Sequence, residues 1–199
     1  MAPDLPADLY VSGDIEADGP IPGQYSMLSF GLCLAGRFDG REFQALDPGA
    51  QTFYAELQPI SERFDPEAVR VSRLNREELK RKGRAPRDAM TEAARWVRKA
   101  AGDDRTVFVG FPVVFDWMFL YWYFVAFADG GSPFDFSAVL DMKTMFQQKA
   151  RVVTAAAGLS DLPAELDSRR PHTHNALDDA LRQAEIFARL FLWGGRAAP

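Results

Sequence analysis

The sequence predicts a single α/β domain built on a mixed sheet. The first third of the chain alternates extended apolar segments with turns, whereas the remainder alternates helical patterns with short apolar segments. This order of elements is typical of α/β domains with a mixed sheet. The length of 199 residues and a hydrophobic content of 47% suit one compact core. We therefore expect one domain over residues 1–199, with a core of about 9–193.

Three strands are expected near the N-terminus. Residues 9–16 form the first, and residues 26–35 are almost continuously apolar, as in a buried strand. Residues 51–59 alternate well enough to form a third strand. Glycine- and proline-rich residues 17–25 and a turn at 38–40 connect them. These short connections predict an antiparallel meander.

Helices dominate the rest of the chain. The first of them has an apolar stripe formed by Met90, Ala93, Ala94 and Val97. The expected elements, in chain order, are a helix at 87–101, a strand at 106–110, an apolar helix at 115–128, a short strand at 139–141, a helix at 142–151, a loop at 154–171 and a final helix at 176–193.

The composition limits the kinds of site that the chain can hold. The formal net charge is −5, so no overall basic field attracts polyanions, and contact with nucleic acid would have to be local. Cys33 is the only cysteine, which excludes an internal disulfide framework and a cysteine-based zinc site. His172 and His174 are too few for a histidine-based metal cage.

No membrane or secretory segment is expected. The N-terminus lacks the basic and apolar regions of a secretory signal. Residues 111–127 are membrane-like in hydropathy, but they contain Pro112 and Asp116 and lack basic flanks, so they predict a buried helix. We therefore expect a cytoplasmic protein.

Asp14 and Glu16 are the first candidate site residues. They lie two positions apart in the expected strand at 9–16, so their side chains share one face. Adjacent carboxylates repel each other unless a proton or cation lies between them, and a divalent ion such as Mg²⁺ prefers oxygen ligands. Taken alone, the pair is better explained by a strand with an acidic solvent face.

Asp116 is the second candidate. It follows the strand expected at 106–110 and is the only charged residue between Arg105 and Asp129. An aspartate at this place could cap the following helix. A metal or a hydrogen-bond partner would equally explain it, because an unpaired buried carboxylate is costly.

The start of the last helix supplies the third group. Asp179 falls well away from the apolar stripe of this helix, so it is not a core residue. Asn175 suits the N-cap, and Asp178 suits a capping box, which leaves Asp178 out of the site. His174 precedes the helix in a loop that could bring it to Asp179, whereas we expect His172 to be simply exposed.

In this order the motifs resemble those of the DEDDh 3′–5′ exonucleases of the ribonuclease H-like superfamily. The resemblance spans residues 9 to about 191, and the matching residues are Asp14, Glu16, Asp116, His174 and Asp179. It implies a ribonuclease H-like fold, with a mixed five-stranded sheet flanked by helices, and a hydrolase that acts at the 3′ end of single-stranded nucleic acid. One departure is Pro112, which stands where the family often has an asparagine.

The resemblance also implies roles for the site residues. Two divalent ions, Mg²⁺ or Mn²⁺, would clamp the scissile phosphate. Asp14 would bridge both ions, Glu16 and Asp179 would complete the shell of the water-activating ion, and Asp116 would bind more weakly or through water. His174 would be the general base for the attacking water, a task that the near-neutral reference pKa of histidine suits.

Substrate contacts are expected from stacking side chains and local positive charge. The candidates are Ala17 through its backbone, Tyr25, Met27, Trp117, and Arg84 within the basic run 73–87. The apolar side chains are explained at least as well as core, and the basic run equally well as a solvated face. Arg169 and Arg170 form a second basic group near the third motif.

The sequence leaves open which nucleic acid is the substrate and whether the protein is a homodimer. RNA is somewhat favoured over DNA, with a DNA proofreading or repair exonuclease as the alternative. A non-catalytic nucleic-acid-binding protein on the same fold is a second alternative, favoured only by Pro112. Some relatives form homodimers in which a basic patch serves the other subunit, so a homodimer is an alternative to a monomer.

Overall fold

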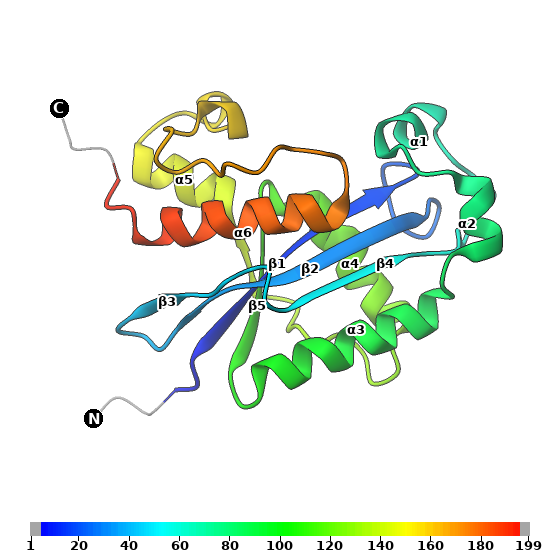
Figure 1. Ribbon diagram of the computed structural model, residues 1–199, viewed down its shortest axis with the longest axis horizontal. Helices are drawn as coiled ribbons and strands as arrows, with labels where there is room; N and C mark the ends of the chain where they lie inside the picture. Colours follow the sequence, from blue (N-terminus) through cyan, green and yellow to red (C-terminus); the bar gives the residue numbers. More distant parts are fainter. Residues whose placement is uncertain (1–4, 196–199) are drawn as a thin grey trace.

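A mixed sheet of six strands forms the centre of the molecule (Figure 1). In chain order the strands are β1 (Asp8–Ala17), β2 (Met27–Phe38), β3 (Phe43–Ala45), β4 (Thr52–Glu56), β5 (Arg105–Gly110) and β6 (Val139–Asp141). The computed structural model describes residues 5–195, in which neighbouring strands follow the path β3-β2-β1-β5-β6 and β4 also pairs with β2. The predicted α/β class with a mixed sheet is confirmed, with one strand more than the five expected.

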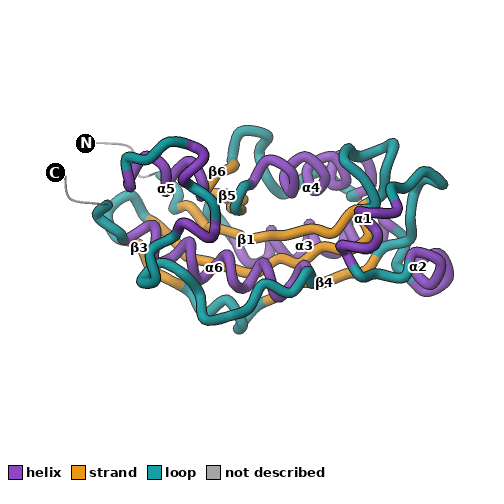
Figure 2. Tube along the Cα trace, turned by 90° about the horizontal axis from the view of Figure 1, so that it is seen from above, coloured by secondary structure: helices purple, strands orange, loops and turns teal. Residues whose placement is uncertain are grey.

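The helices form layers on both faces of this sheet. They are α1 (Pro66–Ser72), α2 (Arg76–Lys82), α3 (Pro86–Ala101), α4 (Val113–Phe127), α5 (Met142–Ala150) and α6 (Ala176–Leu192). Helix α6 packs on β2 and β1, whereas α3 and α4 share a core with the opposite face. Figure 2 shows β1 running between α4 and α6. Two 3₁₀ turns, Thr154–Ala156 and Leu159–Asp161, interrupt the segment predicted as a loop.

Strand β1 has a central place in the sheet. It pairs antiparallel with β2 along its whole length and parallel with β5 over its first half. The register places Asp14 opposite Gly31 and Glu16 opposite Ser29. Directly paired residues of antiparallel strands point to the same face of the sheet. Asp14 and Glu16 therefore share a face, as their spacing predicted.

Two apolar cores, one on each face, hold the layers together. The core beneath α3 and α4 contains the fully buried side chains of Phe30, Phe108 and Phe124. The core beneath α5 and α6 contains Tyr10 and Phe187, whose ring centroids lie 4.8 Å apart. Cys33 is buried in this second core, as a small apolar residue.

Three short elements were not predicted, namely β3, α1 and α2. Each spans only three or seven residues, which is too short for a periodic apolar pattern to show. The capping residues gave a usable signal for the two helices. Asp65 accepts a hydrogen bond from the Glu67 N–H at 2.9 Å before Pro66, and Asn75 accepts one from the Glu78 N–H at 3.1 Å.

Helix α4 is apolar on nearly every side. Its inner face buries Phe119, Leu120 and Phe124, whereas Val114 and Val125 are exposed. The buried-helix interpretation of this run is thus confirmed for one face of the helix. Within residues 5–195, no helix has the combination of length and apolar character needed to cross a membrane.

Helix α6 is fixed against the sheet at both ends. Near its start the Ser12 hydroxyl donates a hydrogen bond to the Ala180 carbonyl at 2.9 Å, and the backbone at Leu177 lies directly over Gly31. At its other end the Lys149 ammonium on α5 donates to the carbonyls of Leu190, Phe191 and Trp193, each at 2.8 Å. Leu190 and Phe191 belong to the last turn and Trp193 is the C-cap residue, so their carbonyls have no intrahelical donor.

Gly31→Ala is expected to destabilise the fold. A Cβ at this position would collide with the Leu177 backbone, so the first turn of α6 must move away from β2. Overpacking of this kind costs about 1–3 kcal/mol. Urea denaturation measures the loss of stability. Gly49→Ala is the matched control, because a Cβ there meets only ordinary contacts. Equal stability of the two variants would contradict the expectation.

Candidate active site

Asp14 and Glu16 stand on the C-terminal half of β1, on the face that α6 covers. The pairing of Asp14 with Gly31, which lies under Leu177, places the carboxylate beside the start of α6. The Glu16 residue is 9% exposed, so it is not part of an open acidic surface. The solvent-face interpretation of this pair is therefore wrong.

Asp179 lies in the first turn of α6 and is 2% exposed. Its carboxylate accepts hydrogen bonds from the backbone N–H groups of Thr173 at 3.0 Å and His174 at 2.9 Å. The imidazole Nδ1 of His172 lies 3.0 Å from Asp179 Oδ1. The loop before α6 is thus wrapped around the Asp179 carboxylate.

The N-cap of α6 is Asn175, as predicted. Its side-chain oxygen accepts hydrogen bonds from the N–H groups of Leu177 and Asp178. The capping box expected from Asp178 is not seen, because the Asn175 N–H donates to the Thr173 hydroxyl instead. Asp178 is exposed and lies outside the carboxylate cluster.

Asp116 occupies the first turn of α4 and is 7% exposed. Its Oδ1 accepts a hydrogen bond from the Ile15 N–H of β1 at 3.2 Å. A different residue, Asp141, accepts the hydrogen bond of the Val113 N–H at the start of α4. The Asp116 carboxylate is therefore directed to β1, between the residues that flank Ile15.

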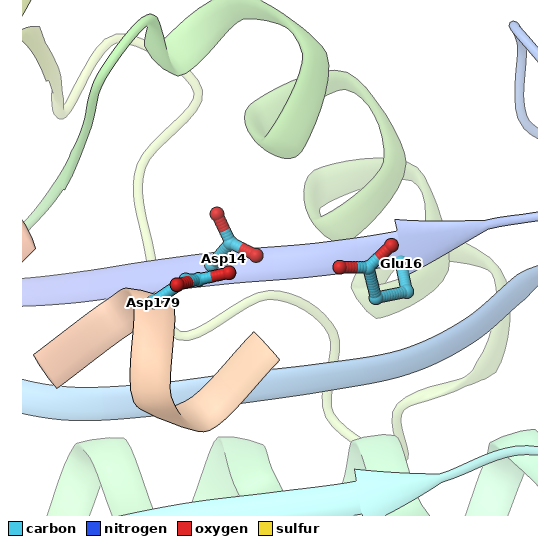
Figure 3. Close-up of side chains that lie close together, drawn as sticks. All are labelled: Asp14, Glu16 and Asp179. Carbon is cyan, nitrogen blue, oxygen red and sulfur yellow. The ribbon is translucent and has the colours of Figure 1, made fainter. Parts of the chain in front are cut away.

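Together these residues form a set of oxygen donors suited to a hard divalent cation. Carboxylate oxygens of Asp14, Glu16 and Asp179 all lie within 4.8 Å of one another (Figure 3). Asp116 is linked to the same part of β1 through Ile15. An all-oxygen donor set of this charge matches the preference of Mg²⁺ or Mn²⁺.

The protonation of the cluster follows from its burial. Burial, together with the charges of Asp116, Glu16 and Asp179, raises the pKa of Asp14 well above its ordinary value. Burial and the charges of Asp179 and Asp116 raise the pKa of Glu16 to about 8. Burial also raises the pKa of Asp116 to about 7. A bound cation would favour the charged forms of all three groups.

Both histidines lie beside the cluster. His174 has a left-handed backbone, with φ of 57°, and is half-buried, and its ring centroid lies 4.4 Å from that of His172. Positive φ is uncommon outside glycine and often marks functional sites. His172 is exposed, as predicted, but its contact with Asp179 was not expected.

The predicted substrate contacts are not all near the carboxylates. Ala17 follows Glu16 at the end of β1, and Tyr25 is half-buried with the Arg63 guanidinium 5.0 Å from its ring centroid. Met27 is fully buried in the core. Trp117 packs on Phe108, Tyr121 and Phe134, on the α4 side of the sheet.

The basic run 73–87 is largely paired with acidic side chains. Arg76 is 5% exposed and forms a buried ion pair with Asp18 at 2.9 Å. Arg84 pairs with Glu92 at 2.5 Å. Further pairs join Lys80 to Glu62 and Glu77, Lys82 to Glu78, and Arg87 to Asp129. These pairs neutralise much of the charge that made the run a candidate phosphate patch.

Gln183 was missed by the sequence analysis. Its side-chain amide donates a hydrogen bond to Asp14 Oδ1 at 2.8 Å and accepts one from the Phe111 N–H at 2.7 Å. The signal was available, because residues four apart on a helix lie on one face and Gln183 follows Asp179 by four. Attention to the apolar stripe alone left it out.

The fold of this chain is similar to that of several solved nucleases. The chain superimposes with a TM-score of 0.65 on a 3′-exonuclease solved for its 3′-end-specific recognition of a histone mRNA stem-loop, at 10% identity over 96% of this chain and 66% of that one. The score is 0.64 for E. coli exonuclease I with a dT13 oligonucleotide, at 15% identity over 92% and 40% of the two chains. For S. pombe Pop2p, in a form with Mg²⁺ and Mn²⁺ bound, it is 0.60, at 16% identity over 90% and 81%. The ribonuclease H-like exonuclease fold is confirmed.

The family follows from closer matches. Residues 42–191 match the family model described as a 3′–5′ exoribonuclease Rv2179c-like domain. An Escherichia coli protein named 3′-5′ DNA exonuclease Cap18 is 38% identical over 181 residues, which is 90% of each chain. The chain belongs to the Rv2179c-like family of 3′–5′ exonucleases, and the predicted enzyme class is confirmed.

The stability of the metal-free protein is expected to fall as the pH rises. The pKa values of Glu16 and Asp116 in the folded protein, about 8 and about 7, lie above the values near 4 of unfolded chains. Between about pH 4 and about pH 8 the folded state therefore binds more protons than the unfolded state, and the free energy of unfolding decreases as the pH rises through this range. Melting temperatures in chelator measure this loss.

Glu16→Gln provides the comparison, because the amide cannot titrate. Its melting temperature should fall less steeply with pH than that of the wild type. Mn²⁺ should raise the wild-type melting temperature more at pH 8 than at pH 5. A wild-type melting temperature that rises from pH 5 to pH 8 would contradict the expectation. A wild-type slope equal to that of Glu16→Gln would contradict the part assigned to Glu16.

Proposed function

We propose that this protein is a metal-dependent 3′–5′ exonuclease that hydrolyses phosphodiester bonds of single-stranded nucleic acid by a two-metal mechanism. The observation that carries the proposal is the convergence of the Asp14, Glu16 and Asp179 carboxylates, from two segments far apart in the chain, to within 4.8 Å. Asp116 adds a fourth carboxylate from a third segment. Three buried acids beside the half-buried Asp14 are costly unless cations accompany them.

Asp14, Glu16, Asp116 and Asp179 would hold the ions. When bound, two divalent ions supply Lewis-acid activation of water and of the scissile phosphate, and they stabilise the leaving 3′ oxygen. Hydrogen bonds from the backbone hold the carboxylates of Asp116 and Asp179 in place, and Gln183 holds that of Asp14. Such fixed donors need little rearrangement when the ions and substrate arrive.

His174 is the proposed general base. Its position beside Asp179 follows from its N–H bond to that carboxylate. From there the imidazole would take the proton of the attacking water, and the leaving 3′ oxygen would be protonated by solvent. His172 shares the same loop and contacts Asp179 through Nδ1, so its expected part is to hold Asp179.

RNA is the first candidate substrate, and DNA is the second. The family description names exoribonuclease activity, which supports RNA. The E. coli relative of 38% identity is named a DNA exonuclease, which supports DNA. Contacts of substrate with Ala17, Tyr25, Met27, Trp117 and Arg84 stay predictions, as does assembly into a homodimer.

Digestion of matched 5′-labelled RNA and DNA strands with Mn²⁺ or Mg²⁺ tests the activity. We expect ladders that shorten from the 3′ end and disappear in chelator and in Asp14→Ala. Asp103→Ala is the control, because Asp103 is an exposed acid in the turn after α3. The ratio of the RNA and DNA rates decides between the two substrates. Absence of cleavage with either metal would sink the proposal, and the non-catalytic alternative would then lead.

His174→Ala is expected to lower kcat by a factor of about 10² to 10⁴, because a general base contributes that much. His172→Ala should lose far less, since it removes one contact to a carboxylate that keeps two backbone donors. Single-turnover rates at saturating Mn²⁺ make the comparison. The assignment of the base fails if His172→Ala is the more impaired variant.

A further inference from the structure

We propose that Gln183 is a positioning residue that holds Asp14 in the orientation in which it binds a divalent ion. The inference rests on the proposed metal-dependent function. Gln183 is 5% exposed and lies on α6 one turn beyond Asp179. Its amide spans from Asp14 Oδ1, at 2.8 Å, to the N–H of Phe111, at 2.7 Å.

The orientation of the amide follows from chemistry. The Phe111 N–H can only donate a hydrogen bond, so the Gln183 atom that faces it must be the oxygen. The NH₂ group must then face Asp14, whose Oδ1 accepts. A buried amide with both ends fixed in this way cannot flip without leaving polar groups unpaired.

The two bonds join all the segments that supply the carboxylates. Asp14 belongs to β1, Asp179 to α6 together with Gln183, and Phe111 lies between β5 and the start of α4, which carries Asp116. A single side chain therefore fixes these three segments relative to one another. Hydrogen bonds from outside the ligand set commonly orient metal ligands in this way.

A neutral donor suits this position better than a charged one. Lysine or arginine would also bond to Asp14, but its positive charge would repel the incoming cation. A glutamate would add a fifth acid to a cluster in which burial and neighbouring carboxylates already raise the pKa of Asp14. The amide donates to one oxygen of Asp14 and leaves the other oxygen for a cation.

Isothermal titration with Mn²⁺ tests the inference on wild type, Gln183→Met and Gln183→Glu. Methionine removes both bonds, whereas glutamate keeps an acceptor for the Phe111 N–H and loses the amide donor to Asp14. We expect Mn²⁺ affinity to fall about 10- to 100-fold in both variants. Because the ligands themselves remain, kcat on a labelled oligonucleotide should recover largely at high Mn²⁺ concentration.

Ser12→Ala is the matched control. It removes another buried bond between β1 and α6, to the Ala180 carbonyl, without touching a carboxylate of the cluster. Its melting temperature should fall while its Mn²⁺ affinity stays at the wild-type value. If Ser12→Ala loses affinity as Gln183→Met does, or if both Gln183 variants bind Mn²⁺ like wild type, the role of Gln183 is overturned. A wild type that binds no Mn²⁺ would overturn the proposed function as well.

Discussion

The repulsion between buried carboxylates is the constraint on which this structure depends. Asp14, Glu16, Asp116 and Asp179 are brought together in a place where water screens their charges poorly. The repulsion would fall if the carboxylates moved apart, yet Asp14, Asp116 and Asp179 are each held by hydrogen bonds to a different part of the chain. The arrangement is unfavourable by itself and becomes favourable when positive charge is supplied. Such a site is prepared for cations before they bind.

The rest of the fold supplies the stability that this site does not. Two apolar cores clamp the sheet, and they hold α6 on one face and α3 with α4 on the other. The closest approach occurs where Leu177 passes over Gly31, which is why β2 needs a residue without a side chain there. The same contact brings the first turn of α6, and Asp179 with it, down to β1. The buried Asp18–Arg76 pair joins the loop that follows β1 to the start of α2.

Much of the fold and of the site could be predicted because their signals are local. Helix α6 carries a clear apolar stripe, the long β2 is almost continuously apolar, and the two-residue spacing of Asp14 and Glu16 on β1 defines a shared face. Asn175 is a cap whose function depends only on its near neighbours. Asp116 was ambiguous, because its partner Ile15 lies about 100 residues away and no local pattern reveals it.

What could not be predicted depends on pairing across the chain. The sequence shows a basic run but not the distant acids that pair with it, such as Asp18 with Arg76 and Asp129 with Arg87. The sequence explains Met27 and Trp117 at least as well as core residues as stacking residues, and only the structure shows that Met27 is buried and that Trp117 packs on Phe108 and Phe134. The spacing of Gln183 from Asp179 indicates a shared helix face, but it does not reveal that two other segments meet at the Gln183 amide.

Lys149 ties the C-terminal end of α6 to the neighbouring helix α5. The carbonyls of Leu190, Phe191 and the C-cap residue Trp193 accept hydrogen bonds from one half-buried ammonium on α5, so the helix cannot fray from that end without breaking these bonds. At the other end, the loop 172–175 bonds mainly to the helix itself, through Asp179 and Asn175. Both ends of α6 are therefore tied, the C-terminal end to α5 and the N-terminal end to the sheet through Ser12 and Gly31. Amide hydrogen exchange within α6 thus requires the helix to separate from its neighbours rather than to fray from a free end.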